Sequence, residues 1–222
     1  KLVGEVAYDV LRMSQKESFD SILDAGCGTG LAGRFLRPLV GGLLVGVDSS
    51  NQMLQKAAQC TLVKGCGLKV EDSTVLDDAG LDGRSSKPLY DKLALSDLET
   101  VTLDDLVSGL SGEKIDGFDL IVAADVFVYI GNLEKILLNF AKLSNGDDSK
   151  ESYLIFSCER IDDEKAPSAG WKVQSSGRYA HTESYVKGVA ESVGFDLLRY
   201  EKIVPRMEKG EEVKGHDFDE DS

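Results

Sequence analysis

The sequence predicts an α/β fold in which helices cover both faces of a mostly parallel sheet. Short apolar runs, typical of buried strands, alternate along the chain with segments whose apolar residues recur at helical spacing. One apolar run ends in an acid and three glycines at alternate positions, a pattern typical of a turn that leads from a strand to a ligand site. With 222 residues, of which 42% are hydrophobic, the chain is large enough for one domain with a substantial core.

Seven strands and six helices are expected in order. The expected strands cover residues 21–25, 42–47, 91–96, 118–124, 153–157, 196–204 and a short stretch near Val213. The expected helices cover residues 1–15, 31–36, 51–58, 103–110, 132–143 and 183–193. Pro38 stops the second helix, Ser49 or Ser50 can cap the third, and Gly194 follows the last one. A turn over residues 208–211 then predicts an antiparallel hairpin strand at the edge of the sheet.

The chain is expected to form a single domain over residues 1–216. Residues 61–90, rich in glycine, proline and scattered acids, are longer than a connection needs to be, which predicts an insertion or a mobile loop. Such a loop either covers a site or lies at the periphery without a function. Residues 217–222 are expected to be a solvated acidic tail.

The glycine-rich turn is compatible with two kinds of nucleotide. Gly28, Gly30 and Gly33 satisfy the dinucleotide pattern G-x-G-x-x-G, and Asp48 follows about twenty residues later, as that pattern requires. However, Asp24 at the end of the strand would repel a pyrophosphate and attract a ligand that carries an ammonium and a sulfonium. S-adenosylmethionine carries both groups.

The residues Asp24-Ala-Gly-Cys-Gly-Thr-Gly30 resemble motif I of the class I S-adenosylmethionine-dependent methyltransferases. The stretch 45–50, followed by Met53, is similar to the second strand of that family with its ribose-binding acid. The resemblance covers residues 21–203 and implies a Rossmann-like, doubly wound, seven-stranded sheet with S-adenosyl-L-methionine as cofactor. Residues 122–131 and 177–181 resemble more narrowly a subgroup of methyltransferases associated with TPR repeats and related to the Williams–Beuren-region methyltransferase.

An acid lies at or just after the end of each of the first four expected strands, at the edge of the sheet where such folds bind ligands: Asp24, Asp48, Asp97 and Asp125. Each of them either caps the next helix or contacts the cofactor. By the resemblance, Asp48 binds the ribose hydroxyls, Asp97 and Leu98 the adenine, and Asp24 the methionine end, directly or through water. Met53 either covers the adenine or belongs to the core. The expected cofactor-binding residues are Asp24, Gly26, Cys27, Gly28, Gly30, Asp48, Ser49, Met53, Asp97, Leu98 and Ala124.

Methyl transfer from a sulfonium needs an acceptor held in line and, for some acceptors, a base. The candidate catalytic residues are Asp125 and His181 as bases and Tyr129 as a positioning hydroxyl. His181 has a plain alternative as a packing residue before a helix. The late aromatic residues either line an apolar acceptor pocket or belong to the core: Phe127, Tyr129, Trp171, Tyr179 and Tyr185.

The composition of the chain disfavours nucleic acid, metal ions and membranes as binding partners. A net charge of −14 disfavours nucleic acid, because phosphate binding needs clustered Lys and Arg. The spacing of Cys60 and Cys66 is not that of zinc ligands, so no metal is expected and the thiols are expected to be reduced. No apolar run is long enough to span a membrane. Because the thiols are expected to be reduced, the protein is expected to be intracellular and cytoplasmic. The chain begins at Lys1 without a methionine, so a preceding segment is expected to be missing.

These observations predict a methyltransferase that uses S-adenosyl-L-methionine and acts on a small-molecule or protein acceptor. Two alternatives stay open. One is an NAD(P)-dependent oxidoreductase that uses the dinucleotide pattern, and the other is a catalytically silent module that only binds the cofactor. The sequence does not indicate the oligomeric state or the acceptor.

Overall fold

The computed structural model describes residues 2–60, 88–110, 115–144, 150–202, 207–208 and 211–212. The chain divides into two compact units, each built from two segments. The first unit comprises Lys1–Val126 and Leu138–Ser157, and the second comprises Phe127–Leu137 and Cys158–Ser222. Most of the expected insertion and the whole acidic tail lie outside the described residues.

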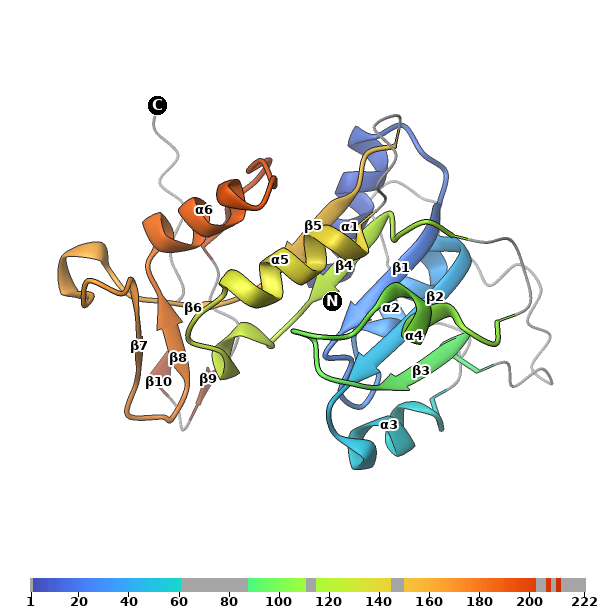
Figure 1. Cartoon of the computed structure of the whole chain (residues 1–222), viewed down its shortest axis with the longest axis horizontal. Helices are drawn as coiled ribbons and strands as arrows, with labels where there is room; N and C mark the ends of the chain where they lie inside the picture. The colour runs from blue at the N-terminus through green and yellow to red at the C-terminus, as the bar shows by residue number, and fades with distance from the viewer. Residues whose placement is uncertain are drawn as a thin grey trace. The chain divides into compact units, whose positions relative to one another are not determined.

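The first unit contains a five-stranded parallel sheet in the order β3-β2-β1-β4-β5 (Figure 1). Its strands are β1 (Phe19–Ala25), β2 (Val40–Asp48), β3 (Lys92–Leu95), β4 (Leu120–Ala123) and β5 (Tyr153–Phe156). β1 is central and pairs with β2 on one side and β4 on the other. The strand order therefore reverses beside β1, which places the topological switch point at the carboxyl ends of β1 and β4. This confirms the Rossmann-like α/β fold.

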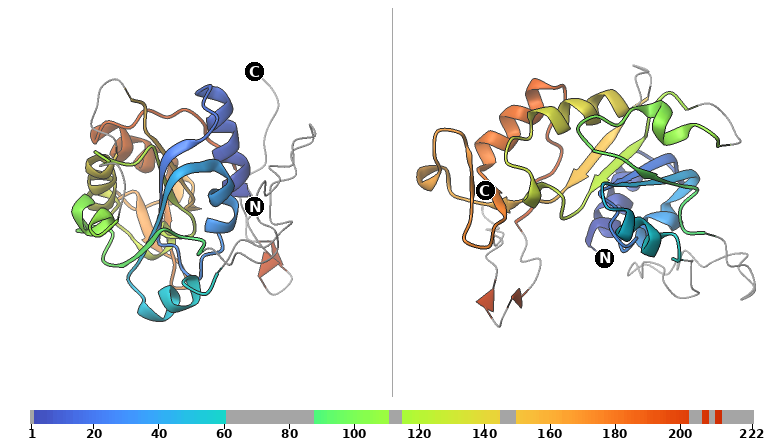
Figure 2. Two further views of the ribbon diagram at one scale, coloured as in Figure 1. Left: turned by 90° about the vertical axis from the view of Figure 1, so that its right-hand side faces the viewer. Right: turned by 60° about the horizontal axis from the view of Figure 1, so that its bottom comes forward.

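Helices lie on both faces of this sheet (Figure 2). They are α1 (Leu2–Met13), α2 (Gly33–Leu36), α3 (Asn51–Ala57), α4 (Leu103–Val107) and α5 (Glu134–Leu143), the last of which runs from the second unit into the first. α1 and α2 pack together on one face, and α4 and the end of α5 lie on the other. α2 is one turn long, shorter than predicted, because the chain tightens into the 3₁₀-helix η1 (Arg37–Leu39), which contains Pro38.

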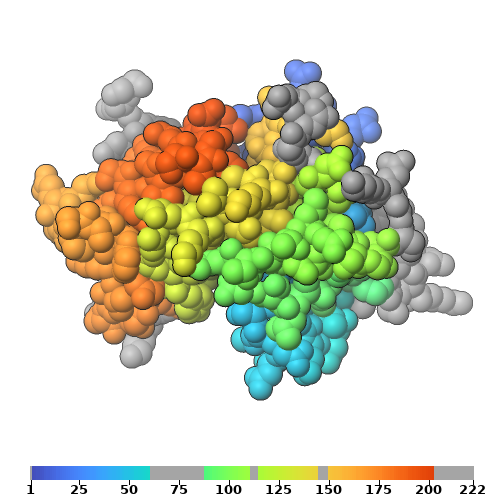
Figure 3. All heavy atoms as spheres, viewed as in Figure 1, coloured from blue at the N-terminus to red at the C-terminus, as the bar shows by residue number. Residues whose placement is uncertain are grey.

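The segment after β3 lies against the C-terminal part of α5 (green and yellow in Figure 3). The amide of Asn139 donates to the carbonyl oxygens of Leu98 and Val101, at 2.9 and 3.0 Å. This pair of hydrogen bonds fixes the chain just beyond the carboxyl end of β3.

The core beneath α1 and α2 determines which way β1 presents its side chains. Ile22 is fully buried in the same cluster as Ala7, Leu11 and Leu36. Because side chains alternate along a strand, Asp24 lies on the same side of β1 as Ile22. The first acid of the glycine-rich motif therefore faces the apolar core, and it is 1% exposed.

The second unit contains a three-stranded sheet that the sequence did not predict. Its order is β6-β8-β7, and β8 is parallel to β6 and antiparallel to β7. The bounds are β6 (Glu159–Arg160), β7 (Trp171–Val173) and β8 (Tyr179–His181), with the 3₁₀-helices η2 (Phe127–Tyr129) and η3 (Asp163–Lys165). α6 (Glu183–Ser192) follows β8, and Gly194 just beyond it has a φ of 96°, which confirms the predicted helix end.

The predicted sixth strand is wrong where the structure describes it. Residues 196–202 form no strand, and Leu197 and Leu198 are both at least half exposed, whereas a strand that packs on a core buries every second side chain. β9 (Met207–Glu208) and β10 (Glu211–Glu212) pair antiparallel across the predicted turn, but in a two-stranded sheet of their own. The last expected strand, near Val213, lies outside the described residues. The prediction of seven strands in one sheet is thus not confirmed.

In the part of the chain that the structure describes, each helix is too short or too polar to cross a membrane.

Candidate cofactor and active site

The loop after β1 is a tight turn tied to the end of β2. Gly26, Gly28 and Gly30 have φ values of 70°, 54° and 83°, in the left-handed region that glycine adopts without strain. The backbone N–H groups of Gly26 and Cys27 both donate to the carbonyl oxygen of Val47, at 2.8 and 3.0 Å. The alternating glycines thus wrap the chain closely around the carboxyl end of its neighbouring strand.

The surroundings of two of these glycines differ. A Cβ at Gly26 would overlap with a methyl group of Val126, so this glycine allows close packing inside the fold. A Cβ at Gly28 would meet nothing within 4 Å. Gly28 therefore leaves its backbone open to a ligand that lies against the turn.

Asp48 connects this turn to the helix after β2. Its Oδ2 accepts a hydrogen bond from the N–H of Gly28 at 2.9 Å, and its Oδ1 accepts one from the N–H of Ser50 at 2.8 Å. Ser50 in turn caps α3 by accepting from the N–H of Met53, which selects it over Ser49 as the cap. A carboxylate oxygen has more than one acceptor position, so the half-buried Asp48 can also accept from a pair of hydroxyl groups.

Asp24 supports the turn from inside the fold. Its Oδ2 accepts a hydrogen bond from the hydroxyl group of Tyr90 at 2.6 Å. The pKa of Asp24 is raised to about 6. Burial is the main cause and the negative charge of Asp48 contributes to the increase, while the hydrogen bond from Tyr90 lowers the pKa. A side chain that is 1% exposed influences a ligand through the turn that it supports.

Tyr90 is a residue of this site that the sequence analysis missed. It precedes β3, and its ring approaches the positions where Gly30 and Gly46 would carry a Cβ to within 3.2 and 3.0 Å. A Cβ at Gly33 would overlap with the Tyr90 hydroxyl group. In the sequence, Tyr90 is the last residue of the expected insertion over residues 61–90, and no local pattern distinguishes it because its partners are distant along the chain.

The thiol of Cys27 lies in the same region and is 5% exposed. Burial raises its pKa well above the ordinary range, and the nearby charges of Asp24 and Asp48 raise it further. The thiol is therefore neutral at physiological pH and acts as a small packing group in the turn.

The other expected cofactor residues follow β2, β3 and β4. Ser49 is exposed and Met53 is 39% exposed, which argues against the alternative of Met53 as a core residue. Asp97 is exposed and accepts from the N–H of Glu99 at 2.8 Å, while Leu98 is half-buried. Ala124 directly follows β4 and is half-buried. Because the strands are parallel, all of these residues lie at one edge of the sheet.

Asp125, one of the candidate bases, is exposed at the same edge. Its N–H donates to the hydroxyl oxygen of Ser157 at 2.9 Å, which joins the ends of β4 and β5. Its φ of 57° lies in the left-handed region, which is uncommon for a residue other than glycine. Such backbone conformations are concentrated at functional sites.

The other two candidates lie in the second unit and differ from each other in exposure. Tyr129, at the end of η2, is 69% exposed. His181 is 1% exposed, its Nε2 lies 3.0 Å from the carbonyl oxygen of Gly131, and its ring stacks on that of Tyr185 with 6.0 Å between centroids. Burial lowers the pKa of His181, so the imidazole is neutral and donates from Nε2 to the carbonyl.

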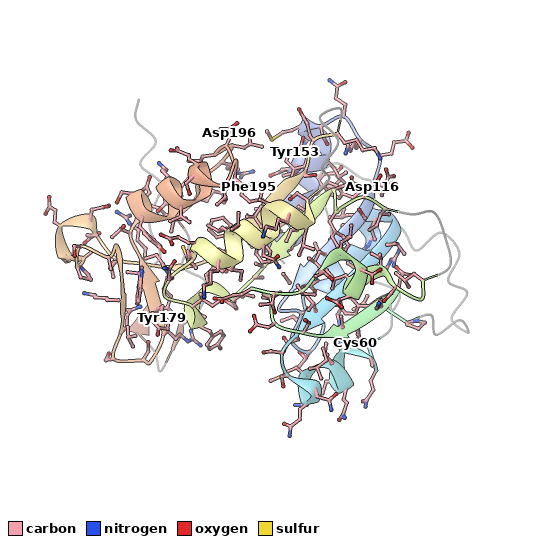
Figure 4. All side chains as sticks on the ribbon, viewed as in Figure 1. Cys60, Asp116, Tyr153, Tyr179, Phe195 and Asp196 are labelled. Atoms are coloured by element: carbon pink, nitrogen blue, oxygen red, sulfur yellow. The ribbon has the colours of Figure 1, made fainter. Side chains whose placement is uncertain are left out.

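The late aromatic residues pack on one another within the second unit. The rings of Trp171 and Tyr179, the latter labelled on β8 in Figure 4, meet edge to face with 5.5 Å between centroids. Both rings approach the position where Gly131 would carry a Cβ, to within 2.5 and 2.7 Å. Phe127 is fully buried. These contacts favour a packed aromatic cluster around Gly131.

Residues 23–146 match the protein family described as methyltransferase domain, which is more than half of the chain. The chain belongs to the class I S-adenosylmethionine-dependent methyltransferases. This membership agrees with the geometry of the turn and decides against the alternative of an NAD(P)-dependent oxidoreductase. No curated protein sequence matches the chain.

Solved structures share the methyltransferase fold at low sequence identity. Magnesium protoporphyrin IX methyltransferase from Synechocystis PCC 6803 with bound SAM is 18% identical, with a TM-score of 0.55 over 92% of this chain and 73% of that one. The [4+2]-cyclase SpnF is 14% identical, with a TM-score of 0.59 over 91% and 61%. A putative S-adenosylmethionine-dependent methyltransferase from Listeria monocytogenes is 14% identical, with a TM-score of 0.51 over 92% and 89%. At these identities the matches establish the fold.

Proposed function

We propose that this methyltransferase binds its cofactor over Gly28 and Asp48 and methylates a small-molecule or protein acceptor. The observation that carries the proposal is the carboxylate of Asp48, which is fixed by the N–H groups of Gly28 and Ser50 beside the open backbone of the turn. An acceptor-only group held rigidly next to uncovered backbone suits a ribose with two adjacent hydroxyl groups. The bound cofactor would supply an activated methyl group on a positively charged sulfur.

The remaining cofactor contacts are assigned by position at the same edge of the sheet. Asp97 would accept from the adenine amino group, and Leu98 would pack against the ring. Ser49 and Met53 would flank the adenosine from the start of α3, and Ala124 would border the methionine end. The ionised Asp24 would favour a cationic ligand and hold the turn in shape.

On the acceptor side, we assign proton transfer to Asp125 where the acceptor requires it. Its support is exposure at the end of β4 and a backbone conformation typical of functional residues. Tyr129, which is also exposed, is proposed to orient the acceptor through its hydroxyl group. The burial of His181 favours its alternative role as a packing residue.

We also propose that the chain belongs to the TPR-associated subgroup. Its two signature segments, 122–131 and 177–181, meet within the second unit through the hydrogen bond between His181 and Gly131. If these two segments together form a structural element that the subgroup shares, they should lie in contact, as Gly131 and His181 do. A subgroup member solved with its acceptor, in which these segments do not touch, would contradict this assignment.

A second candidate function is cofactor binding without methyl transfer. The fold match to a protein described as a [4+2]-cyclase supports keeping this candidate, because one fold can carry different reactions. The two candidates share the cofactor site and differ only in turnover.

Calorimetric titration with S-adenosylhomocysteine and, separately, NAD tests the cofactor site. We expect S-adenosylhomocysteine alone to bind, and Asp48→Ala to weaken its binding by about 1–3 kcal/mol, since a charged acceptor is lost. Asp104→Ala, which removes an exposed acid from α4, is the matched control and should bind normally. Unchanged affinity in Asp48→Ala would remove this residue from the site. Labelled S-adenosylmethionine offered with a panel of metabolites and proteins then separates methyl transfer from silent binding.

A further inference from the structure

We infer that Tyr90 is a positioning residue for the cofactor turn, acting through Asp24 and through the glycine backbone. The inference rests on the proposed cofactor site. It assigns a function to a side chain at the very end of the expected insertion over residues 61–90, outside motif I.

The first contact is the hydrogen bond between two buried groups. Tyr90 is 5% exposed and Asp24 is 1% exposed, and the Tyr90 hydroxyl group donates to the carboxylate at 2.6 Å. A buried carboxylate needs hydrogen-bond donors to stay ionised, and bonds to charged groups are among the strongest in proteins. Tyr90 therefore maintains the negative charge of Asp24.

The second contact is between the ring and the backbone. The ring lies within 3.2 Å of the Cβ position at Gly30, which ends the turn, and within 3.0 Å of that at Gly46 on β2. The hydroxyl group occupies the space of a Cβ at Gly33, which begins α2. The Tyr90 side chain thus packs against the turn, the strand β2 beside it and the helix α2 after it. Its displacement would therefore remove packing contacts from all three elements.

The electrostatic surroundings of Asp24 make this arrangement sensitive to pH. The groups that act on its carboxylate are the hydroxyl of Tyr90, the charge of Asp48 and a backbone hydrogen bond from Gly33, and the neutral thiol of Cys27 lies beside it. Burial and Asp48 favour the protonated form, and the two hydrogen bonds favour the ionised form. Without the hydroxyl group, Asp24 would take up a proton at a higher pH.

Protonation of Asp24 has two consequences for the site. The carboxyl group loses the charge that attracts the ammonium group, which S-adenosylmethionine and S-adenosylhomocysteine share, and one of its oxygens becomes a donor that faces the donors of Tyr90 and Gly33. Both effects weaken cofactor binding. The affinity for the cofactor should therefore decrease as the pH decreases through the titration of Asp24.

The test is the affinity for S-adenosylhomocysteine between pH 5 and pH 9, measured by calorimetry on the full chain. In the natural protein we expect binding to weaken below about pH 6, the pKa of Asp24. Tyr90→Phe keeps the ring and removes the hydroxyl group, and it should shift this midpoint upward by about one pH unit. Asp24→Asn should abolish the midpoint.

Tyr153→Phe is the matched control. Tyr153 on β5 (Figure 4) also donates its hydroxyl group to a carboxylate, that of Glu151, at 2.5 Å, but away from the turn. This variant should keep the affinity and the midpoint of the natural protein. Loss of one tyrosine hydroxyl group is then excluded as the general cause.

The outcomes separate the inference from the function on which it rests. Normal binding in the natural protein, with an unshifted midpoint in Tyr90→Phe, would overturn the inference alone and leave Tyr90 as a packing residue. An absence of binding in the natural protein at every pH would overturn the proposed site and the inference together. If Tyr90→Phe does not fold, a midpoint that persists in Asp24→Asn overturns the inference.

Discussion

The carboxylate of Asp48 at the end of β2 accepts a hydrogen bond from the backbone N–H of Gly28 in the turn after β1. This contact joins two residues that lie 20 positions apart in the sequence, and it holds the second motif against the first. The ends of two strands thereby form one connected surface. A site that is preorganised in this way loses little conformational entropy on binding.

Gly28→Ala should weaken the binding of S-adenosylhomocysteine at least tenfold, because the methyl group would occupy the open space over the turn. The substitution also places alanine at a φ of 54°, which costs about 1 kcal/mol of stability. Gly109→Ala is a control with the same backbone problem, since Gly109 has a φ of 79° and open space around it, but lies after α4. Equal binding losses in both variants would show that backbone strain, and no ligand contact, is responsible.

Asp24→Asn should stabilise the protein above pH 6. The folded-state pKa of about 6 is above the ordinary value of 3.8, so ionisation of this buried group opposes folding at neutral pH. This destabilisation by the ionised Asp24 is largest above pH 6, decreases as the pH falls from 6 to 4, and disappears below the unfolded-state pKa. From these two pKa values the full difference is about 3 kcal/mol. Urea unfolding of both proteins between pH 4 and pH 8 measures it, and a constant difference between them would contradict the assignment.

His181→Phe should destabilise the protein by about 1–3 kcal/mol at pH 8, because it leaves the Gly131 carbonyl oxygen without its donor. Burial lowers the pKa of His181, so the neutral imidazole contributes its full stabilisation to the folded state above the unfolded-state pKa of 6.5. This contribution to the free energy of unfolding is lost as the pH falls below 6.5. The difference between the two proteins should therefore shrink in acid. Normal stability combined with the loss of the base-dependent limb of the pH–rate profile would restore His181 as a candidate base.

Gly131→Ala should destabilise the second unit by about 1–3 kcal/mol, because the added methyl group would collide with the rings of Trp171 and Tyr179. Gly188→Ala in α6 is the matched control. The added Cβ would meet nothing within 4 Å, and alanine favours a helix more than glycine does. This variant should therefore raise the free energy of unfolding by about 0.5–1 kcal/mol. Denaturant midpoints of the two variants should move in opposite directions, and a common direction would contradict the packing around Gly131.

Local patterns allowed the sequence to predict the turn, the acid at the end of β2 and a serine cap on α3, although they left Ser49 and Ser50 as alternatives for the cap. A glycine pattern at the end of an apolar run and a serine before a helix are signals that span only a few residues. Parallel strands then require the residues that follow them to share one edge of the sheet. The common location of the residues proposed to bind the cofactor could therefore be predicted without a structure.

Contacts between distant residues could not be predicted in the same way. Asp24 and Tyr90 are 66 positions apart, and Gly131 and His181 are 50 apart, so no spacing indicates either pair. The strands of the second unit have two or three residues each, too few to show an alternation. Conversely, the sequence predicts a strand over residues 196–204, but residues 196–202 form none, because a strand exists only where another one hydrogen-bonds to it.

The second unit is assembled from two stretches of polypeptide, with Leu138–Ser157 of the first unit between them along the chain. No single cut therefore separates the units. A chain that ended at Ser157 would keep Gly131 and lose His181, the partner of its carbonyl oxygen. Anyone who exchanges this region with that of another methyltransferase must transplant both stretches together, or the hybrid will contain half of a folded unit.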